Sequence, residues 1–262
     1  MNSRKVQRMV VKIGASVLTD AHGQPHEARL NHLVEQVAAL MVRRCEVLLV
    51  SSGAIAWGMA RVGLHRRPAE IATLQACAAI GQGALMRSYS QAFAKRDVLT
   101  AQVLLTRADL EHVTRRRNAV HTLQELFARH AVPIVNENDV VAVEEIAFGD
   151  NDRLSAMVAC LVRADLLVLL SDVDGLLHQG RVVERVEELN HHHHAMVLGH
   201  SRETTTGGMA SKLTAARMVL DEGIPMVIAN GTKAGVLLKA LKEKPLGTLF
   251  VPPKRTGRSH AR

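Results

Sequence analysis

Two polar segments in the middle of the chain carry the residue types that could do chemistry. The first, NEND at 136–139, directly follows the apolar run 132–135, which is typical of a buried parallel strand. Ligands of an α/β sheet bind beyond the carboxyl ends of its strands. The second, GDND at 149–152, precedes apolar residues at helical spacing and therefore lies at a helix N-terminus. One polar residue there is accounted for by ordinary helix capping. Three in a row leave two interpretations open at this point, a simple helix cap and a functional site.

Two other predicted strands also end in polar groups. Lys12 lies at the end of the strand 6–13, two residues before Gly14, and Ser52-Gly53 follows the apolar run 47–50. A lysine at a strand end is usually just solvated, and a Ser-Gly pair usually makes a simple turn into a helix. The backbone amides and the hydroxyl of Ser52-Gly53 would also suit an anion at the same edge of the sheet.

A glycine- and lysine-containing segment, TTTGGMASK at 204–212, precedes the helix predicted over 209–222. Glycines before a helix let the backbone approach a phosphate. Lys212 would lie in the first helical turn, where a cation opposes the helix dipole, so a bound anion explains it better than helix stability does. The spacing is not that of a Walker A loop, and no strand is followed by GxGxxG, so a dinucleotide-binding fold is not expected.

Predicted strands and helices alternate along the whole chain. Apolar runs at 98–105 and 166–170 indicate further strands, and helical patterns begin near 30, 68 and 119. This alternation predicts an α/β fold, a three-layer αβα sandwich with a central, mostly parallel open sheet covered by helices on both faces. We found no Pro- or Gly-rich linker and no internal repeat, so a single domain is expected.

The composition favours a soluble, cytoplasmic protein. Of the 262 residues, 47% are apolar but only 2% aromatic, so the core must be aliphatic. No apolar run reaches the roughly 18 residues of a membrane span, and no signal peptide precedes the first strand. Cys45, Cys77 and Cys160 are odd in number and widely spaced, which indicates reduced thiols rather than a disulfide framework.

The net charge of +8 raises the question of nucleic-acid binding. The densest basic cluster, 115–117, has no interleaved aromatic residues on which bases could stack. A positive field also attracts small anionic substrates, which we consider the better interpretation. Nucleic-acid binding is therefore not expected.

Several motifs, in this order, resemble those of the glutamate 5-kinases within the amino acid kinase family: VVKIGASVL, VSSGAIAWG, LLTRAD, VPIVNENDVVAVEEI, GDNDRLSA, LLSDVDGL, TTTGGMASKL and GTLF. The resemblance runs from about Val6 to Val251. It implies ATP-dependent phosphorylation of the side-chain carboxylate of L-glutamate, the first step of proline biosynthesis. ATP is the implied co-substrate and Mg²⁺ the implied cofactor.

The resemblance also implies roles for individual residues. The expected catalytic residues are Lys12, Asp152, Lys212 and Asp150. The expected glutamate-binding residues are Ser52, Asp139, Asn151 and Asn136, with Glu137 in the same loop. The expected ATP-binding residues are Lys12, Gly14, Ser171, Asp172, Thr206, Gly207, Gly208, Met209, Ala210, Ser211 and Lys212. No side chain is assigned as a metal ligand, and His191–His194 are assigned no role.

The expected organisation is a kinase domain over 1–251 and a basic tail over 252–262, without the C-terminal PUA domain that many bacterial relatives carry. The expected partners are L-glutamate and ATP, other copies of the chain in a dimer or tetramer, and glutamate-5-semialdehyde dehydrogenase in transient contact; no membrane partner is expected. The segment 174–189 is shorter than usual, and Leu177 stands where a tyrosine is common. Two alternatives remain open: another amino acid kinase with a different carboxylate substrate, and a regulatory or nucleic-acid-binding pseudokinase.

Overall fold

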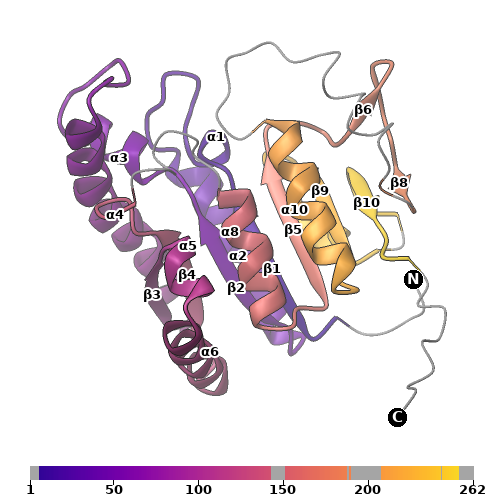
Figure 1. Cartoon of the computed structure of the whole chain (residues 1–262). Helices are drawn as coiled ribbons and strands as arrows, with labels where there is room; N and C mark the ends of the chain where they lie inside the picture. Colours follow the sequence, from indigo (N-terminus) through magenta and orange to yellow (C-terminus); the bar gives the residue numbers. More distant parts are fainter. Residues whose placement is uncertain (1–5, 143–150, 188, 190–207, 243, 254–262) are drawn as a thin grey trace.

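The computed structural model describes residues 6–142, 151–187, 189, 208–242 and 244–253 (Figure 1). Asp150, Thr206, Gly207 and the histidine run 191–194 lie outside these ranges.

The described residues form one large sheet with the strand order β3-β4-β2-β1-β5-β9-β10-β8. All pairings from β3 to β9 are parallel, and β10 runs antiparallel to β9. The strands are β1 (Arg8–Ile13), β2 (Glu46–Ser51), β3 (Thr100–Leu105), β4 (Val132–Glu137), β5 (Leu166–Ser171), β8 (Arg185–Val186), β9 (Met226–Asn230) and β10 (Thr248–Phe250). A separate hairpin pairs β6 (Leu177–His178) with β7 (Arg181–Val182).

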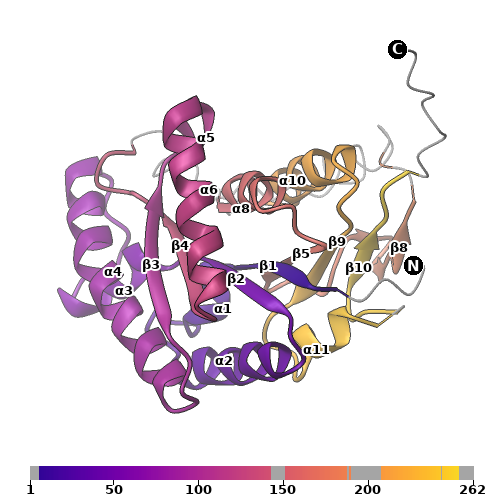
Figure 2. The ribbon, with the colours of Figure 1, turned by 90° about the horizontal axis from the view of Figure 1, so that it is seen from below.

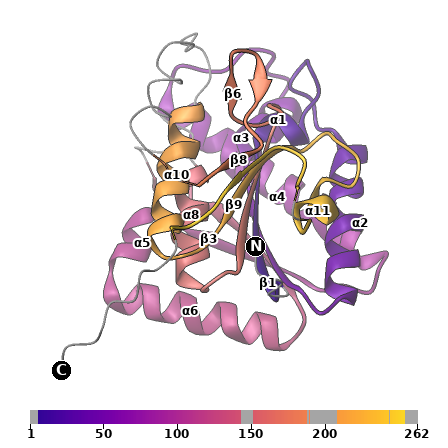
Figure 3. The same cartoon turned by 90° about the vertical axis from the view of Figure 1, so that its right-hand side faces the viewer.

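Helices cover both faces of the sheet, which confirms the predicted three-layer αβα class (Figure 2). One face carries α1 (Ala15–Leu18), α2 (Glu27–Val42), α3 (Ala54–Arg61), α4 (Ile71–Ala94) and α11 (Val236–Ala240). The other carries α5 (Arg107–Glu111), α6 (Val113–Ala128), α8 (Asn151–Leu161) and α10 (Met209–Asp221). Figure 3 shows α10 and α11 on opposite sides of the sheet. None of the described helices is long and apolar enough to cross a membrane.

Alternation along the strands decides which side chains face which helices. In β1, Met9, Val11 and Ile13 belong to the core under α2, whereas Val10 belongs to the core under α8 and α10. Successive side chains of a strand point to opposite faces. Lys12 therefore faces α8 and α10, as Val10 does.

Helices α3 and α4 pack backbone against backbone. A Cβ atom added at Gly58 would collide with the carbonyl oxygen of Cys77, and one added at Gly81 would collide with that of Ala54. Since these obstacles are main-chain atoms, they cannot swing aside. Glycine at both positions allows the close approach that fixes α4 beside the end of β2, from which α3 starts.

We expect Gly81→Ala to lower the free energy of unfolding by about 2 kcal/mol or more, because overpacking against a fixed carbonyl forces the two helices apart. The matched control is Gly83→Ala in the same helix, where an added Cβ meets nothing within 4 Å. That change should leave stability equal or raise it by up to about 1 kcal/mol, from helix propensity alone. Urea unfolding followed by the fluorescence of Trp57, the one tryptophan, measures both. Equal stability of the two variants would contradict the close packing.

Candidate active site

The polar groups of β1, β2, β4 and β5 meet at one edge of the sheet, because these four neighbouring strands are parallel and end together. Helix α8 begins at this edge with Asn151, and α10 begins with Met209. Two hydrogen-bonded clusters form there, one on each side of the first turn of α8.

The first cluster joins Lys12, Asp152 and Lys212. The Lys12 Nζ lies 2.7 Å from Asp152 Oδ1, and the Lys212 Nζ donates to Asp152 Oδ2 at 3.1 Å. The three residues come from β1, α8 and α10, and their exposed fractions are only 7%, 0% and 6%. Two cations from opposite ends of the chain therefore share one buried carboxylate.

Electrostatics keep this carboxylate ionised. Burial alone would raise the pKa of Asp152, but the charges of Lys12 and then Lys212, with their hydrogen bonds, outweigh burial and hold that pKa below its ordinary value. The hydroxyl of Ser211 also donates to Asp152 Oδ2 at 2.9 Å. Asp152 consequently acts as a fixed negative charge that orients both lysines.

The second cluster centres on the side-chain amide of Asn151. Its Nδ2 lies 2.9 Å from the Ser51 carbonyl oxygen, 3.0 Å from Ser52 Oγ and 2.9 Å from Asn136 Oδ1. These contacts tie the end of β2 and the end of β4 to α8. Since Asn151 and Asp152 are consecutive, the first turn of α8 holds the two clusters side by side.

The ends of β1 and β5 add backbone and hydroxyl groups to the edge. The Gly14 N–H donates to the Leu170 carbonyl oxygen at 2.9 Å, and a Cβ added at Gly14 would lie 3.1 Å from that oxygen and 3.9 Å from Lys12 Nζ. Glycine thus lets the backbone approach the Leu170 carbonyl closely beside the lysine. Ser171 is buried, and its hydroxyl donates to the exposed Asp172 carboxylate at 3.0 Å.

The remaining candidates fall into three groups. Asp139 is half-buried in the turn after β4, beyond Asn138. Gly208 precedes α10, whose first turn holds Met209 to Lys212. Asp150, Thr206 and Gly207 lie outside the described residues.

Sequence reasoning missed three residues that contact this edge: Ser51, Gln82 and Tyr89. The buried Tyr89 hydroxyl lies 3.0 Å from Ser51 Oγ, and Gln82 Oε1 accepts from Asn136 Nδ2 at 2.8 Å. The available signal was the spacing of seven between Gln82 and Tyr89, which places both on one face of α4.

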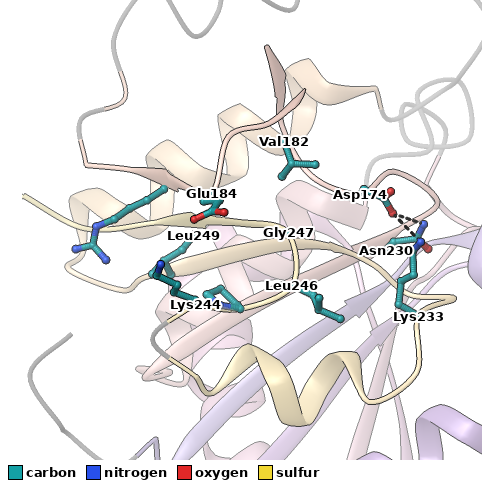
Figure 4. Close-up of a pocket in the computed structure, with 11 residues that line it drawn as sticks. Asp174, Val182, Glu184, Asn230, Lys233, Lys244, Leu246, Gly247 and Leu249 are labelled. Carbon is teal, nitrogen blue, oxygen red and sulfur yellow. Dashed lines mark hydrogen bonds and ion pairs between the residues drawn. The ribbon is translucent and has the colours of Figure 1, made fainter. Parts of the chain in front are cut away.

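A cavity of about 660 Å³ lies beside the Ser171–Asp172 end (Figure 4). Asn230 connects the cavity to the end of β5, because its Nδ2 donates to the Asp172 carbonyl oxygen at 3.3 Å and to Asp174 Oδ1 at 2.8 Å. Lys12, Asp152 and Lys212 do not line this cavity. The residues that line it are Asp174, Val182, Glu184, Arg185, Asn230, Lys233, Lys244, Pro245, Leu246, Gly247 and Leu249.

Replacing the buried acid gives a direct test of the cluster. We expect Asp152→Asn to lower the free energy of unfolding by about 3 kcal/mol near neutral pH, because two buried ammonium groups lose their counter-charge. The pKa of Asp152 is lower in the folded chain than the roughly 3.9 of an unfolded aspartate. Its contribution is therefore complete above about pH 4 and is lost as pH falls through the folded pKa.

Urea titrations of wild type and variant over this pH range measure the difference. The control is Asp221→Asn, which removes an exposed partner of Arg217 and should change stability by less than about 1 kcal/mol throughout. A gap between wild type and Asp152→Asn that stays the same in acid would contradict the charged state.

Comparison with known proteins agrees with this architecture. Residues 7–230 match the sequence profile described as the amino acid kinase family. The chain is 46% identical over 257 residues to a protein named glutamate 5-kinase from Symbiobacterium thermophilum, covering 94% of this chain and 97% of that protein. It is 43% identical over 267 residues to a protein of the same name from Clostridium acetobutylicum, covering 97% and 100%.

A solved structure has the same fold at low sequence identity. The N-acetylglutamate synthase of Neisseria gonorrhoeae, complexed with coenzyme A and L-arginine, superposes with a TM-score of 0.67 at 15% identity. The match covers 94% of this chain and 61% of the synthase. With a family profile spanning most of its length and relatives of similar size above 40% identity, the chain belongs to the amino acid kinase family.

Proposed function

We propose that the chain is a glutamate 5-kinase, which transfers the γ-phosphoryl group of ATP to the side-chain carboxylate of L-glutamate and forms L-glutamyl 5-phosphate and ADP. The relatives named glutamate 5-kinase support this substrate and do not favour another carboxylate. The structural observation that carries the proposal is the convergence of Lys12 and Lys212 on Asp152. The product would enter proline biosynthesis.

The reaction needs stabilisation of negative charge on the transferred phosphoryl group rather than a general base. A glutamate side chain has an ordinary pKa of about 4.3, so its carboxylate is already ionised near neutral pH. One of its oxygens forms the new bond to the γ-phosphorus while the bond to the bridging oxygen breaks, and the leaving ADP keeps that electron pair. Lys12 and Lys212 would flank the moving phosphoryl group and stabilise its negative charge. Asp152 holds both ammonium groups at that place.

The backbone and hydroxyl groups at the ends of β1 and β5 suit the phosphates of ATP bound together with Mg²⁺. We propose that Gly14, Ser171 and Asp172 and the start of α10, with Thr206 and Gly207 before it, take the phosphates of ATP. Among the described residues, His, Cys, Asp and Glu side chains form no group of three able to hold a metal. Mg²⁺ would therefore be held mainly by phosphate oxygens and water, as is usual for this ion, and when bound it neutralises phosphate charge. Asp150 would support Asp152.

The acceptor side uses the second cluster. We propose that Ser52, Asn151 and Asn136 bind the glutamate, because their side chains already lie within hydrogen-bond distance of one another through Asn151 Nδ2. Asp139 would bind the α-ammonium group, which explains a carboxylate beside a pocket for an acidic substrate. Glu137, which the sequence predicts in a loop, is the buried last residue of β4 and would orient the turn that follows it.

The family resemblance further supports three proposals about the cellular context. The enzyme would act in the cytoplasm, as a dimer or tetramer of identical chains. It would pass its phosphorylated product on in transient contact with glutamate-5-semialdehyde dehydrogenase.

We expect ADP formation that depends on L-glutamate and Mg²⁺, with little or none when aspartate, N-acetylglutamate or carbamate replaces glutamate. Lys12→Met and Lys212→Met should each lower kcat at least about 100-fold, because each removes a cation at the transferred phosphoryl group. Lys242→Met, an exposed lysine, is the control and should retain wild-type rates. Coupled ADP detection measures all four proteins. Turnover with another acceptor, or full activity of a cluster variant, would overturn the assignment.

Asp139→Asn should mainly raise the KM for glutamate, by about 10-fold or more, because the ammonium group loses its charged partner. The KM for ATP should stay within about 2-fold of wild type. Initial rates at varied glutamate and varied ATP separate the two. An unchanged glutamate KM would remove Asp139 from the pocket.

A further inference from the structure

Helix α4 carries three polar side chains along one side: Gln82 and Tyr89, which are buried against the sheet, and Gln75, which is half-buried near the turn after β4. They are spaced by seven residues, which is close to two helical turns, so they form one line along the helix. Tyr89 is fully buried and Gln82 is 9% exposed. Buried polar side chains in an otherwise apolar interface call for partners.

Each of the three contacts a different segment of the proposed acceptor side. The Gln75 Nε2 donates to the Val140 carbonyl oxygen at 3.0 Å, in the turn that holds Asp139. Gln82 Oε1 accepts from Asn136 Nδ2 at 2.8 Å. The Tyr89 hydroxyl lies 3.0 Å from Ser51 Oγ, in the residue just before Ser52.

Strand alternation explains why α4 reaches these groups. Ile134 of β4 and Leu49 of β2 pack in the core on the α4 side of the sheet. Asn136 and Ser51 lie two positions further along the same strands, so their side chains face α4 as well. Lys12 faces the opposite layer. Within the described part of the chain, Gln75, Gln82 and Tyr89 make no hydrogen bond to Lys12, Asp152 or Lys212.

The hydrogen bonds also fix which way each amide points. Asn151 Nδ2 donates to a backbone carbonyl, that of Ser51, so its orientation is set. Asn136 must then present Oδ1, which also accepts from the Glu137 N–H at 2.9 Å. The Nδ2 of Asn136 therefore points away from Asn151 and donates a hydrogen bond to Gln82 Oε1. Without this acceptor, Asn136 either leaves a buried N–H unsatisfied or flips and faces Asn151 donor to donor.

We propose that Gln82 and Tyr89, with Gln75, are positioning residues for the glutamate half of the reaction. Gln82 acts through Asn136, Tyr89 through Ser51 and thereby Ser52, and Gln75 through the turn of Asp139. The nucleotide half does not depend on them. This inference rests on the proposed function and adds the helix that aligns its acceptor.

The test is a comparison of two glutamines of one helix. Gln82→Met removes the acceptor at similar side-chain volume, whereas Gln91→Met changes an exposed glutamine in the last turns of α4. We expect the glutamate KM of Gln82→Met to rise about 10-fold, the size of one buried amide left unsatisfied, with the ATP KM within about 2-fold. Gln91→Met should match wild type in both constants. A purely structural role would lower thermal stability without separating the two KM values.

Three further measurements keep the result decisive. Tyr89→Phe retains the packing of a fully buried ring and loses only the hydroxyl, so it should show the same selective rise in glutamate KM, about 3-fold to 10-fold. Because Gln82 acts through Asn136, Gln82→Met should add no further rise in glutamate KM to an Asn136→Ala variant. Glutamate titrations followed by Trp57 fluorescence provide a binding readout that does not require turnover.

The outcomes separate the two levels of inference. A wild-type chain without glutamate-dependent ADP formation would overturn the proposed function itself. An active wild type in which Gln82→Met and Gln91→Met have the same glutamate KM would overturn only the role of α4. Equal rises in the KM for glutamate and for ATP would also overturn it.

Discussion

The structure depends on keeping one ionised carboxylate in a buried position. Asp152 has no exposed surface, and a buried charge is tolerated only when opposite charges and hydrogen bonds compensate it. Lys12 and Lys212 supply that compensation from β1 and α10. The sheet must therefore hold β1 beneath α8 and α10 closely enough to keep these ion pairs at 2.7 and 3.1 Å. The same arrangement that satisfies Asp152 leaves two ammonium groups at the edge where phosphates would bind.

The two groups of candidate site residues lie on opposite faces of the sheet. The lysine cluster lies on the face of α8 and α10, whereas the side chains of Asn136 and Ser51 turn to the face of α4. The first turn of α8 contributes to both, through the neighbours Asn151 and Asp152. In the proposed reaction, donor and acceptor are thus aligned by separate layers and meet at one helix start. Under the proposed function, this separation would let a change on α4 alter glutamate binding without disturbing the nucleotide.

Most of the architecture followed from local patterns. The fully apolar run 166–170 became the central strand β5, because a strand buried on both faces shows no alternation. Boundaries were less predictable: the helix expected from residue 119 begins at Val113, where the ring of His112 accepts the Arg115 N–H at 3.4 Å, a cap outside the usual set. Gln82 was missed because its spacing of seven from Tyr89 places both on one face of α4 but does not reveal a partner, and that partner, Asn136, lies 54 positions along the chain. Gln82 and Asn136 come into contact only when the sheet is folded.

The positions of the three cluster residues also bear on how the chain holds together. Lys12 and Lys212 stand 200 positions apart in a chain of 262 residues, so their meeting closes about three quarters of the polypeptide into one loop. Closing so long a loop costs conformational entropy, and this cost must be compensated by contacts between residues far apart in the sequence. A phosphate held between the two lysines would act as a reversible cross-link between the first strand and the C-terminal third. Nucleotide binding would then stabilise the whole chain cooperatively and not merely its own pocket.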